Sequence, residues 1–415
     1  MKLREPELGA ERTGFALGSY GPSAALLTGG IDRPYAYGIA TGLASKGVKL
    51  DVIGSSELDC ADIREASGIT FLDLHGDVRA QSRMWRKALR YLVVYGKLIK
   101  YAATAKPRIF HILWNYKLPF FDRTCLMLYY KILGKKIVFT AHNVNAAERD
   151  GHESFLNRLS LKLQYRLVDH IFVHTPKMKT DLKEGFGISG EKVSVIRFGI
   201  NNSLPVTELS SACAKKKLGL GQSDKTLLFF GRIRPYKGLD FLIRAFEKVS
   251  FQDRSYRLLI AGEVLKDSTQ YWQEVQDAIE RTGTASQIIQ NIRFIEDADT
   301  EVYFKAADAL VLPYTAIFQS GVLFLSYSFG LPVIATDVGA LREDIVEGET
   351  GYTCHARDEN DLARAISTYF GSDLYKTLEQ RRQLIKEFAQ THNSWDTISE
   401  ATSKVYSELL AGTSS

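Results

Sequence analysis

Short runs of apolar residues recur along the chain, and each run is separated from the next by a helical or polar stretch. In the first half these runs predict strands at 23–28, 48–53, 109–113, 137–140, 170–174 and 193–196. In the second half they predict strands at 226–230, 256–261, 292–295, 309–312 and 332–335, with helices at 239–249, 271–281, 301–306, 321–329 and 359–370. Short strands that alternate with helices are typical of parallel sheets covered on both faces.

The length of 415 residues fits two domains better than one core. A polar stretch at 201–213 predicts the linker between them. We therefore expect an α/β protein with two Rossmann-like, doubly wound parallel-sheet domains, at 1–200 and 201–393, facing each other across a cleft. The segment 394–415 carries apolar residues at helical spacing, which predicts a C-terminal helix. Ligands of such sheets bind beyond the carboxyl ends of the strands, so functional residues should lie in strand-to-helix loops.

Charge is divided unevenly between the two halves. Residues 1–200 carry 30 Lys and Arg against 19 Asp and Glu, a net charge of +11, and the remainder carries 23 against 29, a net of −6. The stretch 78–121 contains no acidic residue, and aromatic and aliphatic residues are interleaved with its cations. A helix with this composition can lie on an anionic lipid surface; the alternative is a surface helix that packs its apolar side on the core. The cations predicted to face the membrane are Arg83, Arg86, Lys87, Arg90 and Lys97.

Several other classes of protein are disfavoured. The basic stretch has no nucleic-acid-reading motif, so we expect no nucleic acid partner. No uncharged apolar run is long enough to span a bilayer, and the polar first twelve residues do not read as a secretory signal. The four cysteines are far apart and form no metal-binding cluster, so we expect no metal and a reducing compartment. These features predict a cytoplasmic protein, peripheral on the inner face of the cytoplasmic membrane.

The segment 229–238, FFGRIRPYKG, links a predicted strand to a helix that begins at Gly238. This placement brings Arg232 and Lys237 to the mouth of the cleft. Arginine contacts two phosphate oxygens at once, and lysine acts as a point charge. The pair therefore predicts a diphosphate site, and the alternative is a surface turn with incidental charge.

The segment QSGV, from Gln319 to Val322, precedes an almost wholly apolar helix. Such a helix should be buried, and its first N–H groups then need partners. Small polar residues at Ser320 and Gly321 leave room for an anion on those amides. The alternative is that Ser320 caps its own helix.

Three loops of the first half carry further candidates. Gly30 belongs to a Gly-Gly pair after the first strand, which permits close approach of a ligand or a simple tight turn. His142 and Asn143 follow a later strand and could hydrogen-bond sugar hydroxyls, although a lone histidine is more often structural. His111 and Trp114 close the preceding strand in the same way and are predicted to line the acceptor side.

Together, FFGRIRPYKG, the QSGV helix with the GLPVIATDVGALREDIVEGETGY run, and TAHN at 140–143 resemble one family. They are similar to retaining, family-4-type glycosyltransferases of the GT-B fold, over nearly the whole chain and most specifically over 226–352. The resemblance implies transfer of a hexose from a nucleotide-diphosphate sugar, with no metal and no cofactor. It also implies that the C-terminal helix crosses back to the N-terminal domain.

The resemblance also implies roles for individual residues. Arg232 and Lys237 match the diphosphate-binding pair, His142 matches the histidine that touches the donor sugar, and Gly30 matches the glycine-loop residue near the donor phosphate. We expect His142, Arg232 and Lys237 to be catalytic, with Gln319, Ser320, Gly321 and Val322 at the diphosphate. The basic stretch resembles the membrane-docking helix of members that act on lipid-linked acceptors.

The chain departs from the family at one place. Many members carry two glutamates eight positions apart around the last helix, where this chain has Ile317 and Leu325. The QSGV segment instead resembles a subgroup that lacks this pair. Contacts to the nucleotide or sugar must then come from elsewhere, and Glu263 and Glu343 are candidates.

The expected function is transfer of a sugar, with retention, from a nucleotide-diphosphate sugar to a hydroxyl of a glycan or lipid-linked acceptor. Synthesis of cell-surface polysaccharide or glycolipid would use such an activity. Two alternatives stay open: a nucleotide-sugar epimerase of the same fold, and a non-catalytic partner protein that keeps the fold without turnover.

Overall fold

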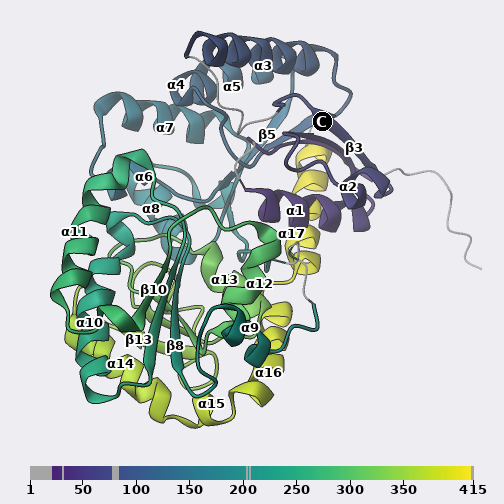
Figure 1. Cartoon of the computed structure of the whole chain (residues 1–415). Coiled ribbons are helices and arrows are strands. Elements are labelled where there is room, and N and C mark those ends of the chain that lie inside the picture. The colour runs from purple at the N-terminus through teal and green to yellow at the C-terminus, as the bar shows by residue number, and fades with distance from the viewer. Residues whose placement is uncertain (1–20, 30–31, 77–83, 202–203, 205–206, 413–415) are drawn as a thin grey trace, which may run out of the picture.

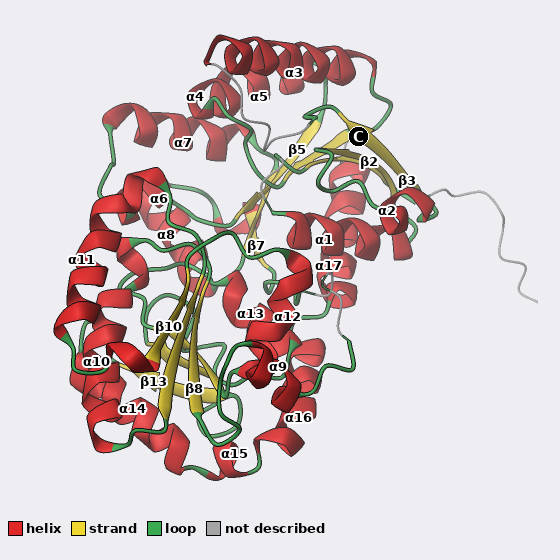
Figure 2. Ribbon diagram, in the orientation of Figure 1, coloured by secondary structure: helices red, strands yellow, loops and turns green. Residues whose placement is uncertain are grey.

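The computed structural model describes residues 21–29, 32–76, 84–201, 204 and 207–412. These residues form two parallel β-sheets, and each sheet is flanked by its own set of helices (Figures 1 and 2). The predicted α/β class with two Rossmann-like domains is confirmed.

The N-terminal sheet has seven strands in the order β3-β2-β1-β4-β5-β6-β7. Its strands are β1 (Ser23–Leu27), β2 (Lys49–Gly54), β3 (Ile69–Asp73), β4 (Ile109–Ile112), β5 (Lys136–Ala141), β6 (His170–Val173) and β7 (Val193–Val195). Its helices are α1 (Arg33–Ser45), α2 (Ala61–Glu65), α3 (Met84–Thr104), α4 (Pro119–Phe121), α5 (Met127–Ile132), α6 (Ala146–Arg149), α7 (Phe155–Leu167) and α8 (Pro176–Phe186). Every residue of the interior strands β4 and β6 is buried, which fits their mainly apolar sequences, each with one histidine.

The C-terminal sheet has six strands in the order β10-β9-β8-β11-β12-β13. Its strands are β8 (Lys225–Phe230), β9 (Tyr256–Ala261), β10 (Ile288–Asn291), β11 (Ala309–Leu312), β12 (Val333–Thr336) and β13 (Gly351–Cys354). The helices of this half are α9 (Ser211–Lys217), α10 (Leu239–Gln252), α11 (Thr269–Arg281), α12 (Asp297–Ala306), α13 (Gly321–Ser328), α14 (Glu359–Gly371), α15 (Asp373–Lys376) and α16 (Leu378–His392). Strand β8 lies at the centre between β9 and β11, so the loop that follows it opens at the middle of the sheet edge.

The strand prediction fails at three edge positions. The predicted strand at 292–295 is wrong, because β10 pairs with β9 through Ile288–Asn291 instead. The sequence IIQNIRFI offers two apolar clusters, and only pairing with β9 selects the first. Strands β3 and β13 were not predicted, because edge strands are only partly buried and their sequences lack a continuous apolar run.

The two halves meet at two chain segments that are hydrogen-bonded to each other. The N–H of Ile200 donates to the carbonyl oxygen of Asn393 over 3.0 Å, and Trp395 Nε1 donates to the carbonyl oxygen of Ile200 over 2.8 Å. Helix α17 (Trp395–Ala411) then runs along α1 in the N-terminal half (Figure 1). The last helix therefore packs on the first domain, while the rest of the second half packs around its own sheet.

Candidate functional site

The chain turns sharply at the carboxyl end of β8. Gly231 has a φ of +100°, and Gly238, at the start of α10, has a φ of +63°. A Cβ at position 238 would overlap the carbonyl oxygen of Pro313, so glycine allows this turn to pack on the segment after β11. A Cβ at position 231 would lie 3.2 Å from Lys237 Nζ and 3.8 Å from Val322 Cγ2. The ammonium of Lys237 therefore lies beside the end of β8 and near the start of α13.

Lys237 is buried, with 7% of its surface exposed. Among the described residues none accepts a hydrogen bond from its ammonium or forms an ion pair with it; the charge instead lies 5.5 Å from the centre of the Tyr314 ring. Burial, helped by the positive charges of Arg232 and Arg234, lowers the pKa of Lys237 to about 7. A buried cation without a counter-ion is unfavourable, so this position is suited to an anion.

Arg232 lies closer to solvent than Lys237, and its side chain is 59% exposed. Its Nε lies 3.2 Å from Glu263 Oε1, so the glutamate predicted to contact the nucleotide or sugar is engaged with this arginine. Burial raises the pKa of Asp32, at the N-cap of α1 in the other domain, and the charge of Arg232 opposes that rise. The charge of Arg232 thus acts on a carboxyl group of the N-terminal domain.

The start of α13 carries free backbone donors. Ser320 is the N-cap residue and is buried, but its side chain makes no capping hydrogen bond. No described residue accepts a backbone hydrogen bond from the N–H of Gly321 or Val322, and Gly321 is exposed. Self-capping by Ser320 is therefore not what the structure shows. The helix behind it is buried from Leu323 to Tyr327, so this end faces the cleft with donors available.

Gln319 and the loop after β12 form a pair that the sequence did not reveal. Gln319 Nε2 donates to Asp344 Oδ2 over 2.9 Å, and Gln319 Oε1 is buried without a described partner. Asp344 is half-buried, whereas its neighbour Glu343, the predicted candidate, is exposed. The sequence did not single out Asp344, rather than the adjacent Glu343, as the acid that contacts Gln319, because only the loop conformation distinguishes them.

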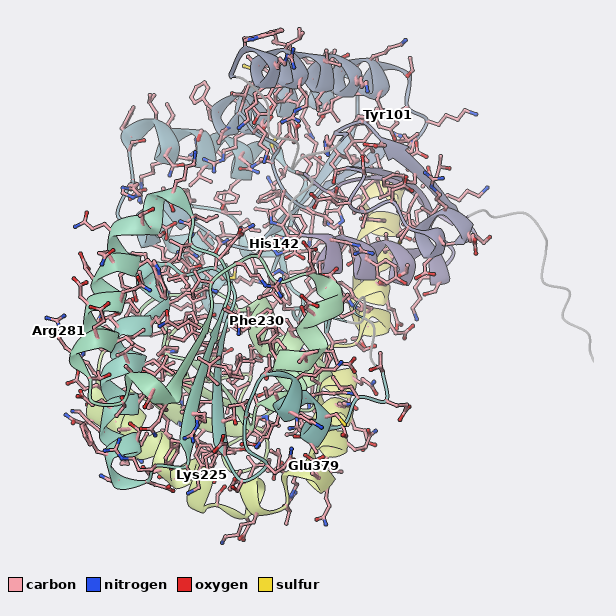
Figure 3. The ribbon with its side chains drawn as sticks, in the orientation of Figure 1. Tyr101, His142, Lys225, Phe230, Arg281 and Glu379 are labelled. Carbon is pink, nitrogen blue, oxygen red and sulfur yellow. The ribbon has the colours of Figure 1, made fainter. Side chains whose placement is uncertain are left out.

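His142 lies where the two domains meet, as Figure 3 shows. Its ring stacks on Trp114 with centroids 4.1 Å apart and planes at 2°. Its Nδ1 lies 3.0 Å from His174 Nε2, and its Nε2 is buried with no described partner. Burial, with smaller contributions from His174 and His111, holds the pKa of His142 well below its usual range, so the ring is neutral at pH 7.

The hydrogen bonds around His142 fix where its proton lies. His174 Nδ1 lies 3.2 Å from the carbonyl oxygen of Ile196, which can only accept, so His174 carries its proton on Nδ1. His174 Nε2 is then an acceptor, and His142 must donate to it from Nδ1. The unpartnered Nε2 of His142 therefore presents a lone pair. It can accept a hydrogen bond from a hydroxyl, but the atom is buried in this structure, so a sugar reaches it only if neighbouring side chains move aside.

The other predicted residues of the N-terminal domain have different surroundings. His111 is fully buried between Tyr406 and Thr140, at 2.6 Å and 2.8 Å, so its ring holds α17 against the sheet and cannot contact an acceptor. Asn143 is half-buried, and its Oδ1 accepts from Arg149 over 3.5 Å. Gly30 lies outside the described residues.

Two contacts join the loops of the domains beside the Lys237 turn. The guanidinium of Arg149 lies 4.4 Å from the centre of the Tyr236 ring, and Arg33 pairs with Asp297 over 3.0 Å. These contacts hold the N-terminal loops that follow β1 and β5 against the loops of the C-terminal domain.

Helix α3 lies at the far end of the N-terminal domain, at the top of Figure 1. Its inner face packs on the core through Val94, Tyr95, Leu98 and Ala102. Its outer face is also apolar: Trp85, Leu89 and Leu92 are 59%, 55% and 68% exposed. Arg86, Lys87, Arg90 and Lys97 flank this outer face, and Arg83 lies outside the described residues. No helix within the described ranges is long and apolar enough to cross a bilayer.

A pocket of about 480 Å³ lies between the domains, next to the segment that precedes Gln319. Ala316, Ile317 and Phe318 line it from the C-terminal domain. Helices α6 and α8 line it from the N-terminal domain, with both acidic and basic side chains. Neither Lys237 nor the QSGV turn belongs to its lining, so it is distinct from the proposed diphosphate position.

Each half of the chain matches the model of a known family over part of its length. Residues 28–204 match the family Glycosyltransferase Family 4, and residues 224–371 match the family Glycosyl transferases group 1. Curated relatives include D-inositol 3-phosphate glycosyltransferases. That of Streptosporangium roseum is 26% identical over 57% of this chain and 56% of its own length, and that of Corynebacterium efficiens is 27% identical over 66% and 65%. The similarity thus spans between about half and two thirds of these relatives.

Solved structures share the fold over nearly the whole chain. Sucrose-phosphate synthase from Thermosynechococcus elongatus superposes with a TM-score of 0.74 at 18% identity, covering 94% of this chain and all of that one. Anabaena HepE in complex with UDP-glucose superposes with a TM-score of 0.69 at 16% identity, over 94% of this chain and all of that one. At these identities the likeness establishes the fold.

Proposed function

We propose that this chain transfers a hexosyl group from a nucleotide-diphosphate sugar. The premise is that its two domains are those of the GT-B glycosyltransferases of group 1 and family 4. The acceptor is a hydroxyl of a glycan or lipid-linked glycan, as in the synthesis of cell-surface polysaccharide or glycolipid. The observation that carries the proposal is Lys237, a buried ammonium that no described anion neutralises, next to the free amides of α13. The complexes of HepE with UDP and UDP-glucose support a nucleotide-sugar donor.

The leaving group in this reaction is a nucleoside diphosphate, whose negative charge grows as the bond to the sugar breaks. Lys237, Arg232 and the N–H groups of Gly321 and Val322 would stabilise that charge without a metal, and the dipole of α13 adds to the effect. Lys237 takes up a proton when the diphosphate binds, because the bound anion is a counter-ion that stabilises the buried ammonium. The diphosphate would thereby be held at the carboxyl edge of the C-terminal sheet.

The N-terminal domain would orient the donor sugar and supply the acceptor side. His142 Nε2 accepts a hydrogen bond from a hydroxyl of the donor sugar and orients it, and Trp114 holds the imidazole in place by stacking. Because the ring is neutral with its proton on Nδ1, we assign His142 an orienting role rather than that of a general acid. The acceptor hydroxyl attacks the anomeric carbon from the face that the leaving group occupies, and the departing phosphate oxygen takes its proton. This path gives retention.

The surface around α3 supports membrane attachment. The apolar side chains of α5 and α7, next to it in Figure 1, are exposed as well: Ile132 by 75%, Phe155 by 79% and Leu156 by 61%. Between residues 123 and 147 the sequence carries no acid, and Asp122 is buried. Exposed apolar side chains beside many cations, with few accessible acids, suit the interface of an anionic leaflet. These features support our proposal that the protein attaches to the inner face of the cytoplasmic membrane, where a lipid-linked acceptor would be available.

A transfer assay tests the proposed function. The protein is first screened by thermal shift with UDP, GDP and ADP, because a ligand that binds the folded state raises the melting temperature. Radiolabelled sugars on the nucleotide that binds are then offered with lipid-linked acceptors. Label in the lipid fraction supports the proposal. Sugar interconversion without acceptor would show an epimerase instead, and binding without any turnover would show a non-catalytic partner.

A further inference from the structure

Positions 317 and 325, where many members of the resembled family carry glutamates, are apolar in this chain. Leu325 is buried in α13, and Ile317 lines the pocket between the domains. The sugar of a nucleotide sugar exposes several hydroxyls, and a carboxylate is the side chain that accepts from two of them at once. A carboxylate from another element that reaches the start of α13 could take over this role.

Asp344 is held at that position by two loops that are tied together. The N–H of Ala340 donates to the carbonyl oxygen of Phe318 over 3.2 Å, which joins the loop after β12 to the loop before α13. Tyr327, on α13 itself, donates its hydroxyl to the backbone oxygen of Asp344 over 2.9 Å. Gln319 then donates to the side chain of Asp344. The carboxylate is thus fixed relative to the residue that immediately precedes Ser320.

Only one oxygen of this carboxylate is engaged. Oδ2 accepts from Gln319, whereas no described residue donates to Oδ1, and Asp344 is only half-buried. Burial raises the pKa of Asp344 to about 6, with opposing contributions from Gln319 and Arg197 and a smaller rise from Glu343. The carboxylate thus has one acceptor oxygen without a described partner.

The loop that carries Gln319 faces the N-terminal domain. Phe318 packs against the core of that domain, and Arg197, which influences Asp344, follows its last strand. A transferred sugar has to lie on this side of the diphosphate, because acceptor groups reach it from the N-terminal domain. Asp344 is tied to the loop that faces this side, so the sugar is the part of the donor that we expect it to meet.

We propose that Asp344 binds a hydroxyl of the donor sugar through Oδ1, and that Gln319 is the positioning residue that holds its carboxylate beside the diphosphate. This inference rests on the proposed function. Ile317 and Leu325 stand where many members of the resembled family carry glutamates. The inference assigns hydroxyl binding to Asp344, in the loop after β12, rather than to its neighbour Glu343.

Calorimetric titration with a nucleotide and its glucose conjugate tests the inference. UDP-glucose, GDP-glucose and ADP-glucose are first titrated into the wild type to find the nucleotide that binds. Asp344→Asn keeps the shape of the side chain and removes its charge; Glu343→Gln tests the rival acid, and Glu349→Gln is the matched control, an exposed acid of the same loop. Thermal melting of each variant establishes that it is folded.

We expect Asp344→Asn to bind the sugar nucleotide about 10- to 100-fold more weakly, the effect of losing a hydrogen bond to a charged group. The free nucleotide should bind within about twofold of wild type, and Gln319→Ala should show a smaller loss confined to the sugar nucleotide, with KM raised more than kcat is lowered. Wild-type affinity in Asp344→Asn, or an equal loss for nucleotide and sugar nucleotide, would overturn the inference while leaving the proposed function intact. If the wild type binds none of the three sugar nucleotides, that result would overturn the proposed function itself.

Discussion

Helices α3 and α13 are both rich in apolar residues, but they lie in opposite environments. α13 has no charged residue, and Leu323 and Phe324 are buried in the C-terminal domain. α3 has cations along its length, and Trp85 and Leu92 are exposed to solvent. The apolar content of a helix therefore does not alone determine whether the helix is buried. The charged residues that the helix itself carries decide the difference between α3 and α13. A helix without charge is drawn into the core and brings its N-terminal amides to the sheet edge, whereas a charged one stays outside and leaves its apolar face in need of a partner.

The largest effect should come from the charge beside α13. Lys237→Ala, and Lys237→Met, which keeps the packing against Tyr314, should each lower turnover by about 10²–10³-fold, the usual effect of removing one group that stabilises developing charge. Steady-state kinetics with the identified donor measures this loss. Lys216→Ala, an exposed lysine of the same domain, should stay within about twofold of wild type. Turnover of Lys237→Met close to wild type would remove the diphosphate assignment.

The next largest effect concerns α3. Reversing Arg86, Arg90 and Lys97 together to glutamate should weaken binding to vesicles of anionic lipid by about 100-fold or more, because each basic residue near such a surface contributes about 1 kcal/mol. Vesicle flotation measures the bound fraction. Reversal of Lys216, Lys217 and Lys266 makes the same change in net charge on the C-terminal domain and should leave flotation unchanged. Equal loss in both variants, or no flotation of the wild type, would show that α3 is not a membrane surface.

A third, smaller effect is the pH dependence of donor binding. With the pKa of free Lys237 at about 7, the lysine is already charged below that pH, and nucleotide affinity should be flat there with respect to this group. Above pH 7 the free protein loses the proton and must take it up on binding, so affinity should fall by up to about tenfold per pH unit. Calorimetry in buffers of different ionisation enthalpy measures the proton uptake. Lys237→Met should abolish the uptake; uptake that persists in this variant would assign it to another group.

The smallest effect on function is expected at the crossing helix α17. Tyr406→Phe leaves His111 Nδ1 without its partner in the core, so the free energy of unfolding should fall by about 1–3 kcal/mol. Denaturant unfolding measures this change. Nucleotide affinity should match wild type, because both residues are buried away from the cleft. A selective loss of activity without a loss of stability would restore His111 to the acceptor site.

Local sequence predicted the fold well where a strand is buried on both faces. Strands such as β4 and β8 read as continuous apolar runs, and the turn from Gly231 to Gly238 was placed correctly between strand and helix. Edge strands β3, β10 and β13 were missed or shifted because their position depends on pairing with a neighbour, which local pattern does not encode.

The candidate site was predicted only in part, for a similar reason. The positions of Arg232, Lys237 and the start of α13 follow from strand ends, so the order of the chain revealed them. The partners of Asp344, His111 and Glu263 depend on loop conformation and on packing between distant segments. Gln319 and Asp344 are 25 residues apart, and nothing in the sequence between them indicates that they touch.

A crystal structure with the bound nucleoside diphosphate tests the central claim most directly. The account predicts diphosphate oxygens within hydrogen-bonding distance of Lys237 Nζ and of the N–H groups of Gly321 and Val322, with Arg232 turned toward the same oxygens. A diphosphate found instead in the 480 Å³ pocket between α6, α8 and Phe318, with Lys237 still buried against Tyr314 and without an anion, would contradict it.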